Sequence, residues 1–308
     1  MSAPRRWIIG RGLLGRALER ASSAPIHAVS VPWGDAAATL DALREGLRVF
    51  VASGGDGALE IHWCAGRAVT STPRETVFAE VDVFRGFLAA VAELPDHVRG
   101  RLTMTLASSV GGAYAGSDAA PFSESTPAAP ASAYGEGKLA MEAALAECAA
   151  RAGFRAFIAR LTNLYGPGQD LTKAQGLISV LTRAQLTGRP ASVYVPLDTL
   201  RDYIYEDDAA ALVSAGAARA AQTPRGTCTL KIVGSGRAVS IGALISALQR
   251  QRRRQSAIML GGGDSRGQAL DLRVRSRVWT DLDALARTSL PEGLHRVYSA
   301  QLRAVAQL

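Results

Sequence analysis

Lysine is nearly absent from this chain of 308 residues, since only three of its 35 basic residues are lysines and the others are arginines. The formal net charge of +8 would suit an anionic partner. However, the excess is spread along the chain, and its one dense cluster, Arg250 with Arg252–Arg254, ends a predicted helix, where the helix dipole favours cations. Aromatic residues are also few, and none interrupts this cluster to offer the stacking surfaces of a single-strand binder. We therefore expect no nucleic acid partner.

Cysteine and histidine are too few and too scattered for a metal site. The three cysteines, Cys64, Cys148 and Cys228, are odd in number, and no two of them have the spacing of metal ligands. The four histidines are equally dispersed. We expect free, buried thiols that are neither metal ligands nor nucleophiles, and we expect no bound metal.

Long apolar runs are missing as well. No stretch approaches the roughly 18–20 residues that cross a membrane, and the first residues carry no secretory signal, because they run directly into a strand-like segment, Trp7–Ile9. We expect a cytoplasmic protein without a membrane partner. A chain of this length buries about three quarters of its unfolded surface, so its core needs no disulfide or structural metal ion.

Strand-like apolar runs alternate with helical patterns, which predicts an α/β fold with a doubly wound parallel sheet. The predicted strands are 7–9, 26–31, 59–64, 102–106, 154–160, 192–195 and 230–233. The predicted helices are 13–18, 36–51, 77–91, 177–186, 207–221 and 241–248, with a loop at 161–168 and a less regular tail. Only one helix fits between the second and third strands, where a full doubly wound unit has a helix, a strand and a helix. The sheet is therefore predicted to be abbreviated after its second strand.

A glycine-rich turn joins the first predicted strand to the first helix. It fits the pattern G-x-G-x-x-G, whose glycines allow a tight turn and let backbone N–H groups approach a pyrophosphate at the helix N-terminus. Such a match is weak alone in a chain with 31 glycines, but its position strengthens it, and a purely structural turn is the alternative. The candidate dinucleotide ligands are Gly10, Arg11, Gly12, Leu13, Leu14 and Gly15.

The residues that would choose between NAD and NADP are ambiguous. An acid near the end of the second strand usually holds a ribose hydroxyl, but Asp35 comes only after Pro32-Trp33-Gly34. Arg11, inside the turn, could bind a 2′-phosphate through two guanidinium nitrogens. We expect NAD or NADP, with a slight preference for NADP because of Arg11.

The most specific pattern is Tyr134-Gly135-Glu136-Gly137-Lys138, which places a phenol and an ammonium on one helix face. A free phenol titrates near pH 10, and a nearby cation lowers that value. Ser132 is placed to cap the helix, and the pair Ser108-Ser109 ends a predicted strand, where α/β sheets gather their ligands. An amphipathic helix face is the alternative, but the glycine turn and the serine pair favour a proton-transfer site.

At this point the sequence resembles the extended short-chain dehydrogenase/reductase family, the NAD-dependent epimerase/dehydratases of sugar nucleotides. The resemblance extends from Ile8 to about Tyr298. It is carried by the glycine turn and the Tyr-Lys helix, and by the segments Ile61–Gly66, Ser108–Tyr114, Pro121–Pro127, Arg160–Gly168, Arg201–Asp208 and Val233–Ile241.

The resemblance implies a role for each matching residue. Tyr134 would be the catalytic acid/base, and Lys138 would tune it and hold the cofactor's ribose, while Ala65 and Gly66 would close over the cofactor. Ser109 fits the substrate-orienting hydroxyl better than Ser108, although both are candidate substrate ligands. Asn163 and Arg201 would bind the diphosphate of a nucleotide-sugar substrate.

Two departures from the family pattern narrow the expected chemistry. The family's first turn glycine is replaced by Ile9, and the Asp–Glu pair of its dehydratases is replaced within Val110–Gly112. Loss of water therefore has no evident acid and base. We expect oxidoreduction at a sugar carbon, by a 4-epimerase or a ketosugar reductase, with a non-catalytic nucleotide sensor of the same fold as the alternative.

The resemblance also implies domains and assembly. We expect a Rossmann-type cofactor domain over 1–165 and a small C-terminal, mainly substrate-binding domain over 166–308, with segments around 192–221 returning to the sheet. Two helices, carrying the Val77–Val91 stripe and the Tyr134–Cys148 stripe, would pair with their copies in a homodimer. Small or apolar residues beyond the sheet-facing stripes support this, namely Phe87, Ala89, Ala90, Ala140, Ala143 and Ala144.

Overall fold

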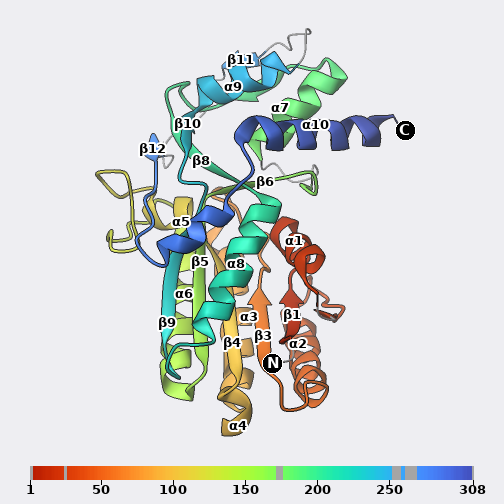
Figure 1. The fold of residues 1–308 in the computed structure, drawn as a ribbon, viewed down its shortest axis with the longest axis vertical. Coiled ribbons are helices and arrows are strands. Elements are labelled where there is room, and N and C mark those ends of the chain that lie inside the picture. The colour runs from red at the N-terminus through yellow and green to blue at the C-terminus, as the bar shows by residue number, and fades with distance from the viewer. Residues whose placement is uncertain (1–2, 24–25, 171–175, 252–257, 261–268, 307–308) are drawn as a thin grey trace.

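The computed structural model describes residues 3–23, 26–170, 176–251, 258–260 and 269–306 (Figure 1). Its main feature is a six-stranded sheet with the order β2-β1-β3-β4-β5-β9, in which all paired neighbours are parallel. The predicted parallel α/β sheet is confirmed. The strands are β1 (Arg5–Ile9), β2 (Ile26–His27), β3 (Leu59–Trp63), β4 (Leu102–Ser109), β5 (Arg155–Leu161) and β9 (Cys228–Val233).

Helices cover both faces of this sheet because its strands are apolar on both sides. Trp7 and Ile9 face one core, whereas Ile8 faces the other, as the alternation of side chains along a strand requires. The first core lies under α2 (Ala36–Ala52), α3 (Arg74–Ala92) and α6 (Ala133–Ala152), and the second under α1 (Leu13–Ala21) and α8 (Glu206–Ala220). Two short helices, α4 (Asp96–Arg99) and α5 (Val110–Tyr114), flank β4.

The sheet stops at β2, as the abbreviated pattern predicted. The expected strand 26–31 is wrong beyond His27, because the chain turns there instead of continuing along β1. The backbone N–H of Trp33 donates to Val31, and that of Asp35 donates to Pro32, just before α2 begins. After α2 the chain passes directly to β3 on the opposite side of β1.

A second group of elements lies at the carboxyl ends of the strands (Figure 1). There β8 (Leu200–Tyr205) pairs with β10 (Ala238–Ser240), β12 (Asp271–Leu272) and β6 (Asn163–Tyr165). A small pair, β7 (Ala191–Val193) and β11 (Ile258–Leu260), lies near three mutually packed helices. These helices are α7 (Leu177–Thr187), α9 (Ile241–Arg250) and α10 (Leu290–Val305), and the 3₁₀ helix η1 (Thr280–Leu285) precedes α10.

Three expectations for this second group are wrong. The segment 161–168 is not all loop, since it contains β6, and the tail is not irregular, since it ends in α10. The strands at 191–205 do not return to the large sheet, because they pair with β6, β10, β11 and β12. Helix α8 does pack on the sheet, and the strand that joins the sheet after it is β9.

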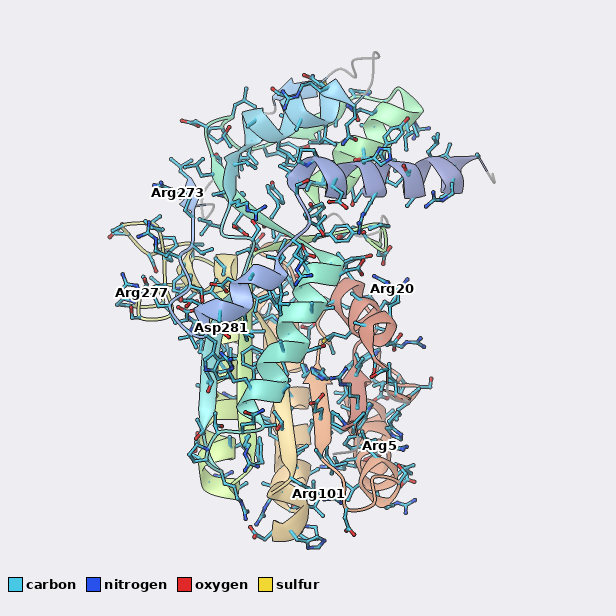
Figure 2. All side chains as sticks on the ribbon, viewed as in Figure 1. Arg5, Arg20, Arg101, Arg273, Arg277 and Asp281 are labelled. Carbon is cyan, nitrogen blue, oxygen red and sulfur yellow. The ribbon has the colours of Figure 1, made fainter. Side chains whose placement is uncertain are left out.

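The surface charges are dispersed, in agreement with the sequence. Figure 2 shows arginines such as Arg20, Arg101 and Arg273 at well separated places on the molecule. Arg250 ends α9, while Arg252–Arg254 lie outside the described residues. Within the part of the chain that the structure describes, no helix is both long and apolar enough to span a bilayer.

Candidate active site

The glycine turn has a geometry that requires two of its glycines. Gly10 has a φ of +95°, and a Cβ built there would lie 2.3 Å from the backbone nitrogen of Ala65. A Cβ on Gly15 would lie 2.1 Å from the carbonyl oxygen of Gly10. β1, the turn and α1 are thus locked together at the carboxyl end of the sheet, beside the loop that follows β3.

Gly12 has the opposite surroundings, because a Cβ on it would meet no atom within 4 Å. This residue caps α1, and among the described residues neither a side-chain hydrogen bond nor an acid in the first turn satisfies that end of the helix. Leu14 is buried in the core, while Leu13 is half-buried next to Gly168. The open space at Gly12, in front of the N–H groups in the first turn of α1, fits the pyrophosphate of a dinucleotide.

The two residues expected to select the cofactor have other partners. Arg11 is 66% exposed on its side chain, yet its guanidinium already pairs with Glu19, with Nε–Oε1 at 2.7 Å and Nη2–Oε2 at 2.9 Å. The carboxylate of Asp35 caps α2 by accepting from the N–H groups of Ala37 and Ala38. In this structure the guanidinium of Arg11 is thus bound by Glu19, and the carboxylate of Asp35 by the start of α2.

The loop after β3 brings the backbone close to Lys138. Gly66 has a φ of +146°, and a Cβ on it would lie 3.6 Å from Lys138 Nζ and 3.4 Å from Glu80 Oε2. The other oxygen of Glu80 accepts from the N–H groups of Arg67 and Ala68 and so fixes this loop. Ala65 is buried against Gly10, which places the glycine turn and Lys138 on two sides of one loop.

Tyr134 and Lys138 lie in the first two turns of α6, which Ser132 caps as predicted through the N–H of Gly135. Both side chains are half-buried, and Lys138 Nζ is 5.9 Å from the centre of the Tyr134 ring. The ammonium donates to the carbonyl of Ala107, on β4, at 3.2 Å. Helix α6 and the end of β4 therefore meet at the predicted pair.

Ser109 lies on the other side of Gly112 from Tyr134. A Cβ on Gly112 would be 3.3 Å from Tyr134 Cε1 and 3.3 Å from Ser109 Cβ, so the two side chains flank one glycine. The half-buried Ser109 hydroxyl accepts from the N–H of Gly112 at 3.0 Å, which leaves its own proton available to donate. The structure thus brings Ser109, Tyr134 and Lys138 together.

Ser108 faces the opposite way, so the structure does not bring it together with Ser109, Tyr134 and Lys138. Its side chain is buried, and its hydroxyl donates to Glu142 Oε1 at 2.5 Å. The cause is the alternation of side chains along β4, which can turn only one of two neighbouring serines towards the site.

A buried ion pair that the sequence reasoning missed lies behind the site. Arg160 of β5 donates to both oxygens of Glu142, with Nη2–Oε2 at 2.6 Å, and its Nη1 donates to the hydroxyl of Tyr114. All three residues are at least 94% buried. Glu142 follows Lys138 by four residues on the same helix face, and this spacing was the available signal.

Asn163 and Arg201, the expected diphosphate ligands, lie on neighbouring strands. In the parallel register Asn163 pairs with Tyr203, so its side chain shares a sheet face with Arg201, two residues before Tyr203. Asn163 is exposed and donates from Nδ2 to the carbonyl of Asp202. Arg201 is half-buried, and burial lowers the pKa of its guanidinium. A desolvated cation of this kind favours an anionic ligand.

Buried Asp202 holds the strand of Arg201 in place from the opposite face. Its carboxylate accepts from the hydroxyl of Thr162, from the N–H and hydroxyl of Ser235, and from the N–H of Arg237. These bonds tie β6 and β8 to the turn after β9. They were not predicted, because no local spacing connects these segments.

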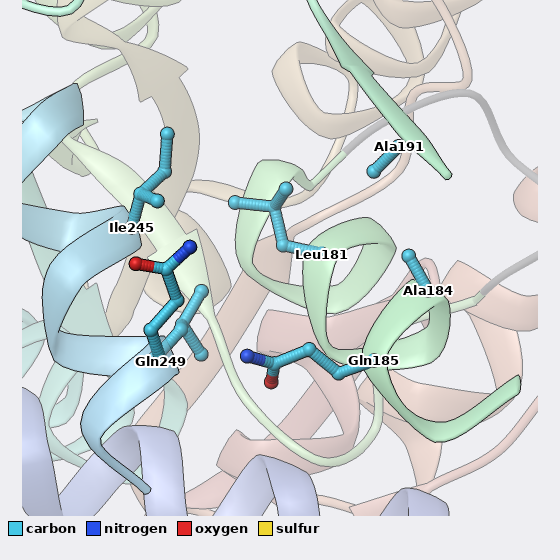
Figure 3. A pocket seen from close by; sticks show the side chains of 7 residues that line it. Leu181, Ala184, Gln185, Ala191, Ile245 and Gln249 are labelled. Atoms are coloured by element: carbon cyan, nitrogen blue, oxygen red, sulfur yellow. The ribbon is translucent and has the colours of Figure 1, made fainter. Parts of the chain in front are cut away.

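The cysteines are free, as expected, although only Cys148 is fully buried and the other two are half-buried. Burial raises the pKa of Cys64 and of Cys228 to about 12, and it also raises that of Cys148. Figure 3 shows a pocket between α7 and α9, two helices of the second group of elements. Its lining residues are Leu181, Ala184, Gln185, Ala191, Ile245, Leu248 and Gln249.

Comparison with known proteins identifies relatives of this chain, some of which carry out sugar-nucleotide chemistry by name. A dTDP-L-rhamnose 4-epimerase from Burkholderia thailandensis is 34% identical over 113 residues, which are 36% of this chain and 30% of that protein. A dTDP-4-dehydro-6-deoxyglucose reductase from Escherichia coli is 30% identical over 134 residues, 44% of this chain and 39% of that protein. The matched segments therefore span well under half of these relatives.

Solved structures match over nearly the whole chain. MoeE5 in complex with UDP-glucose and NAD has a TM-score of 0.81 at 23% identity, covering 98% of this chain and 99% of that one. UDP-glucose 4-epimerase from Thermotoga maritima has a TM-score of 0.76 at 18% identity, covering 99% and 100%. At such identities the likeness shows the fold alone.

The family itself follows from the sequence. The pattern that describes the NAD dependent epimerase/dehydratase family matches residues 65–229, more than half of the chain. The matched range contains Ser109, Tyr134 and Lys138, as well as Asn163 and Arg201. The resemblance stated from the motifs is therefore confirmed, and the chain belongs to the NAD dependent epimerase/dehydratase family.

Proposed function

We propose that this protein uses NAD to carry out oxidoreduction at a carbon of a nucleotide-activated sugar, as an epimerase or as a ketosugar reductase. The observation that carries the proposal is the meeting of Ser109, Tyr134 and Lys138 at the carboxyl end of β4, beside the glycine turn. Proteins similar to this chain bear both kinds of name, 4-epimerase and reductase.

The residues around the glycine turn fit a dinucleotide. The N–H groups at the start of α1, next to the open space at Gly12, would bind its pyrophosphate, and Lys138, close to Gly66, would hold its ribose. When bound, its nicotinamide would supply the hydride acceptor and donor. MoeE5 and two 4-epimerases of similar fold have been solved with NAD, which favours NAD for this chain.

The chain's own residues would move the proton. Tyr134 would take a proton from the sugar hydroxyl during oxidation and return it during reduction, while the ammonium of Lys138 stabilises its phenolate. The hydroxyl of Ser109 would donate a hydrogen bond to the same sugar oxygen, because it accepts from the N–H of Gly112 and keeps its own proton available.

The substrate would be held by its diphosphate. Arg201 offers a partly desolvated guanidinium, and Asn163 offers a side-chain amide on the same sheet face. A charge-assisted contact of this kind orients an anionic group strongly. Loss of water is not proposed, because Val110, Gly111 and Gly112 provide no acid or base after Ser109.

The nucleotide content and the turnover of the purified protein test this proposal. Release of NAD on denaturation, together with interconversion of a nucleotide sugar, would support an epimerase. A protein that is purified empty and oxidises a reduced nicotinamide cofactor with a keto-sugar nucleotide would support a reductase. Cofactor binding without turnover of any sugar nucleotide would instead support a non-catalytic sensor.

We also propose a homodimer formed through α3 and α6. Ala89 and Ala143 are exposed on these helices, and Ala90, Ala140 and Ala144 are half-buried. Phe87 does not contribute, because it is fully buried against Trp7 and Trp63. Arginine at Ala89 or at Ala143 should shift light scattering from dimer to monomer, and a monomeric wild-type protein at micromolar concentration would refute the dimer.

A further inference from the structure

The abbreviated sheet changes the adenosine end of the cofactor site. A complete dinucleotide fold has three strands in the half that binds adenosine, and the acid that holds the ribose follows the second. Here the sheet ends at the two-residue strand β2, and Asp35 is used to cap α2. Among the described residues no strand pairs with β2 on its outer side, and the turn at 28–35 leads directly into α2.

Trp33 is the conspicuous side chain of this turn. It is 45% exposed, although a large aromatic ring gains most from burial. Its ring meets that of Trp63 edge to face, with centroids 6.4 Å apart and an interplanar angle of 89°. Trp63 is itself only 2% exposed, so it forms a fixed base for the exposed ring.

The contact with Trp63 places Trp33 beside the cofactor turn. Trp63 ends β3, where it pairs in register with Ile9, the residue before Gly10. The next residue, Cys64, donates from its N–H to the carbonyl of Ile9 at 2.8 Å. Trp33 thus follows β2 at the same carboxyl edge of the sheet from which the glycine turn departs.

The backbone around Trp33 is held by hydrogen bonds. The carbonyl of Pro32 accepts from the N–H of Asp35 and, at 2.7 Å, from the hydroxyl of Thr39, which is buried on α2. The N–H of Trp33 donates to Val31. An aromatic ring on such an ordered turn loses little entropy when a ligand stacks on it.

We propose that Trp33 forms the adenine wall of the cofactor site, stacking on the base in place of the strand that this sheet lacks. The inference rests on the proposed use of NAD. Adenine is a flat π-system, and a stack with an aromatic side chain needs no hydrogen-bond readout. Stacking on Trp33 would hold the adenosine half of the cofactor even though no acid binds its ribose as in the complete fold.

Binding of cofactor fragments to the full chain tests this. Calorimetric titrations with NAD, AMP and nicotinamide mononucleotide should be compared for the wild type, Trp33→Ala and Trp33→Phe. From the usual size of base–aromatic stacking, Trp33→Ala should raise the Kd for NAD and AMP by about 5- to 150-fold. Trp33→Phe should restore most of that loss, and the Kd for the mononucleotide should not change.

Tyr194→Ala is a matched control, because Tyr194 is 56% exposed and lies just after β7, in the other part of the molecule. It should leave all three Kd values unchanged. Unchanged NAD affinity in Trp33→Ala would overturn this inference and leave the proposed function standing. Equal losses for AMP and the mononucleotide would overturn it in favour of a packing role. A wild-type protein that binds no NAD would overturn the proposed function as well.

Discussion

The hydroxyl of Ser108 donates a 2.5 Å hydrogen bond to the carboxylate of Glu142, one helical turn beyond Lys138. Arg160, on β5, donates hydrogen bonds to both oxygens of the same carboxylate. The end of β4, which carries Ser109, is thereby fixed to the helix that carries Tyr134. A buried ion pair thus sets the spacing of the groups to which we assign proton transfer.

Glu142→Gln should strongly destabilise the protein, because it preserves the side-chain shape but leaves Arg160 as a buried, unpaired cation. Removing one partner of such a pair costs about 3–5 kcal/mol in the free energy of unfolding. Urea unfolding measures this cost. Glu147→Gln is the control on the same helix, because its ion pair with Arg151 is exposed and should contribute little. Equal effects of the two changes would show that the buried pair has no special role.

Lys138→Met should lower kcat and weaken NAD binding together. Methionine keeps an unbranched side chain of nearly the same length but removes the charge near the Tyr134 ring and the hydrogen bond to Ala107. Steady-state kinetics and calorimetric titration report the two effects separately. An unchanged Kd for NAD would deny Lys138 its contact with the ribose.

Arg201→Ala should raise the KM for the nucleotide sugar, since a charge-assisted hydrogen bond contributes about 1.5–3 kcal/mol, or roughly 10- to 150-fold. Arg48→Ala is the control, because Arg48 pairs with Glu45 on the exposed face of α2. A KM that barely moves would contradict the assignment of the substrate diphosphate to Arg201.

His27 should make the protein less stable in mild acid. Burial lowers the pKa of His27 below its ordinary value of 6.5, so the unfolded chain binds the proton more readily than the folded one. Its contribution to stability is therefore present above pH 6.5 and is lost as the pH falls through the lowered folded value. His27→Gln should flatten this part of the curve of unfolding free energy against pH. Identical slopes for the two proteins between pH 7 and 5 would contradict the expectation.

The sequence sufficed wherever a signal was local. The helix at 36–52 and the Tyr134–Lys138 pair were predictable because helical spacing alone places their side chains. The strands β6 and β8 were missed because what stabilises them is pairing between residues about 40 positions apart. Helix α10 is an exception, because it was missed although Ser289 caps it and Leu290, Leu294 and Val297 recur at helical spacing.

Orientation within the site was harder to predict than its composition. The pair Ser108-Ser109 was correctly placed at a strand end, but which hydroxyl faces the site depends on the pleat of β4 and on Glu142. The bond between Arg11 and Glu19 likewise depends on the helix that follows the glycine turn. Hydrogen-bond partners that depend on tertiary packing cannot be predicted from the spacing of residues in the sequence.

Turnover of the Tyr134→Phe variant is the most direct test of the proposed chemistry. The change removes one hydroxyl from a half-buried ring, so the melting temperature and the Kd for NAD should remain close to those of the wild type. With a sugar nucleotide that the wild type converts, kcat should fall by at least about 100-fold, the usual contribution of a general acid/base. A variant that retains most of the wild-type kcat would remove Tyr134 from proton transfer and would contradict the mechanism proposed here.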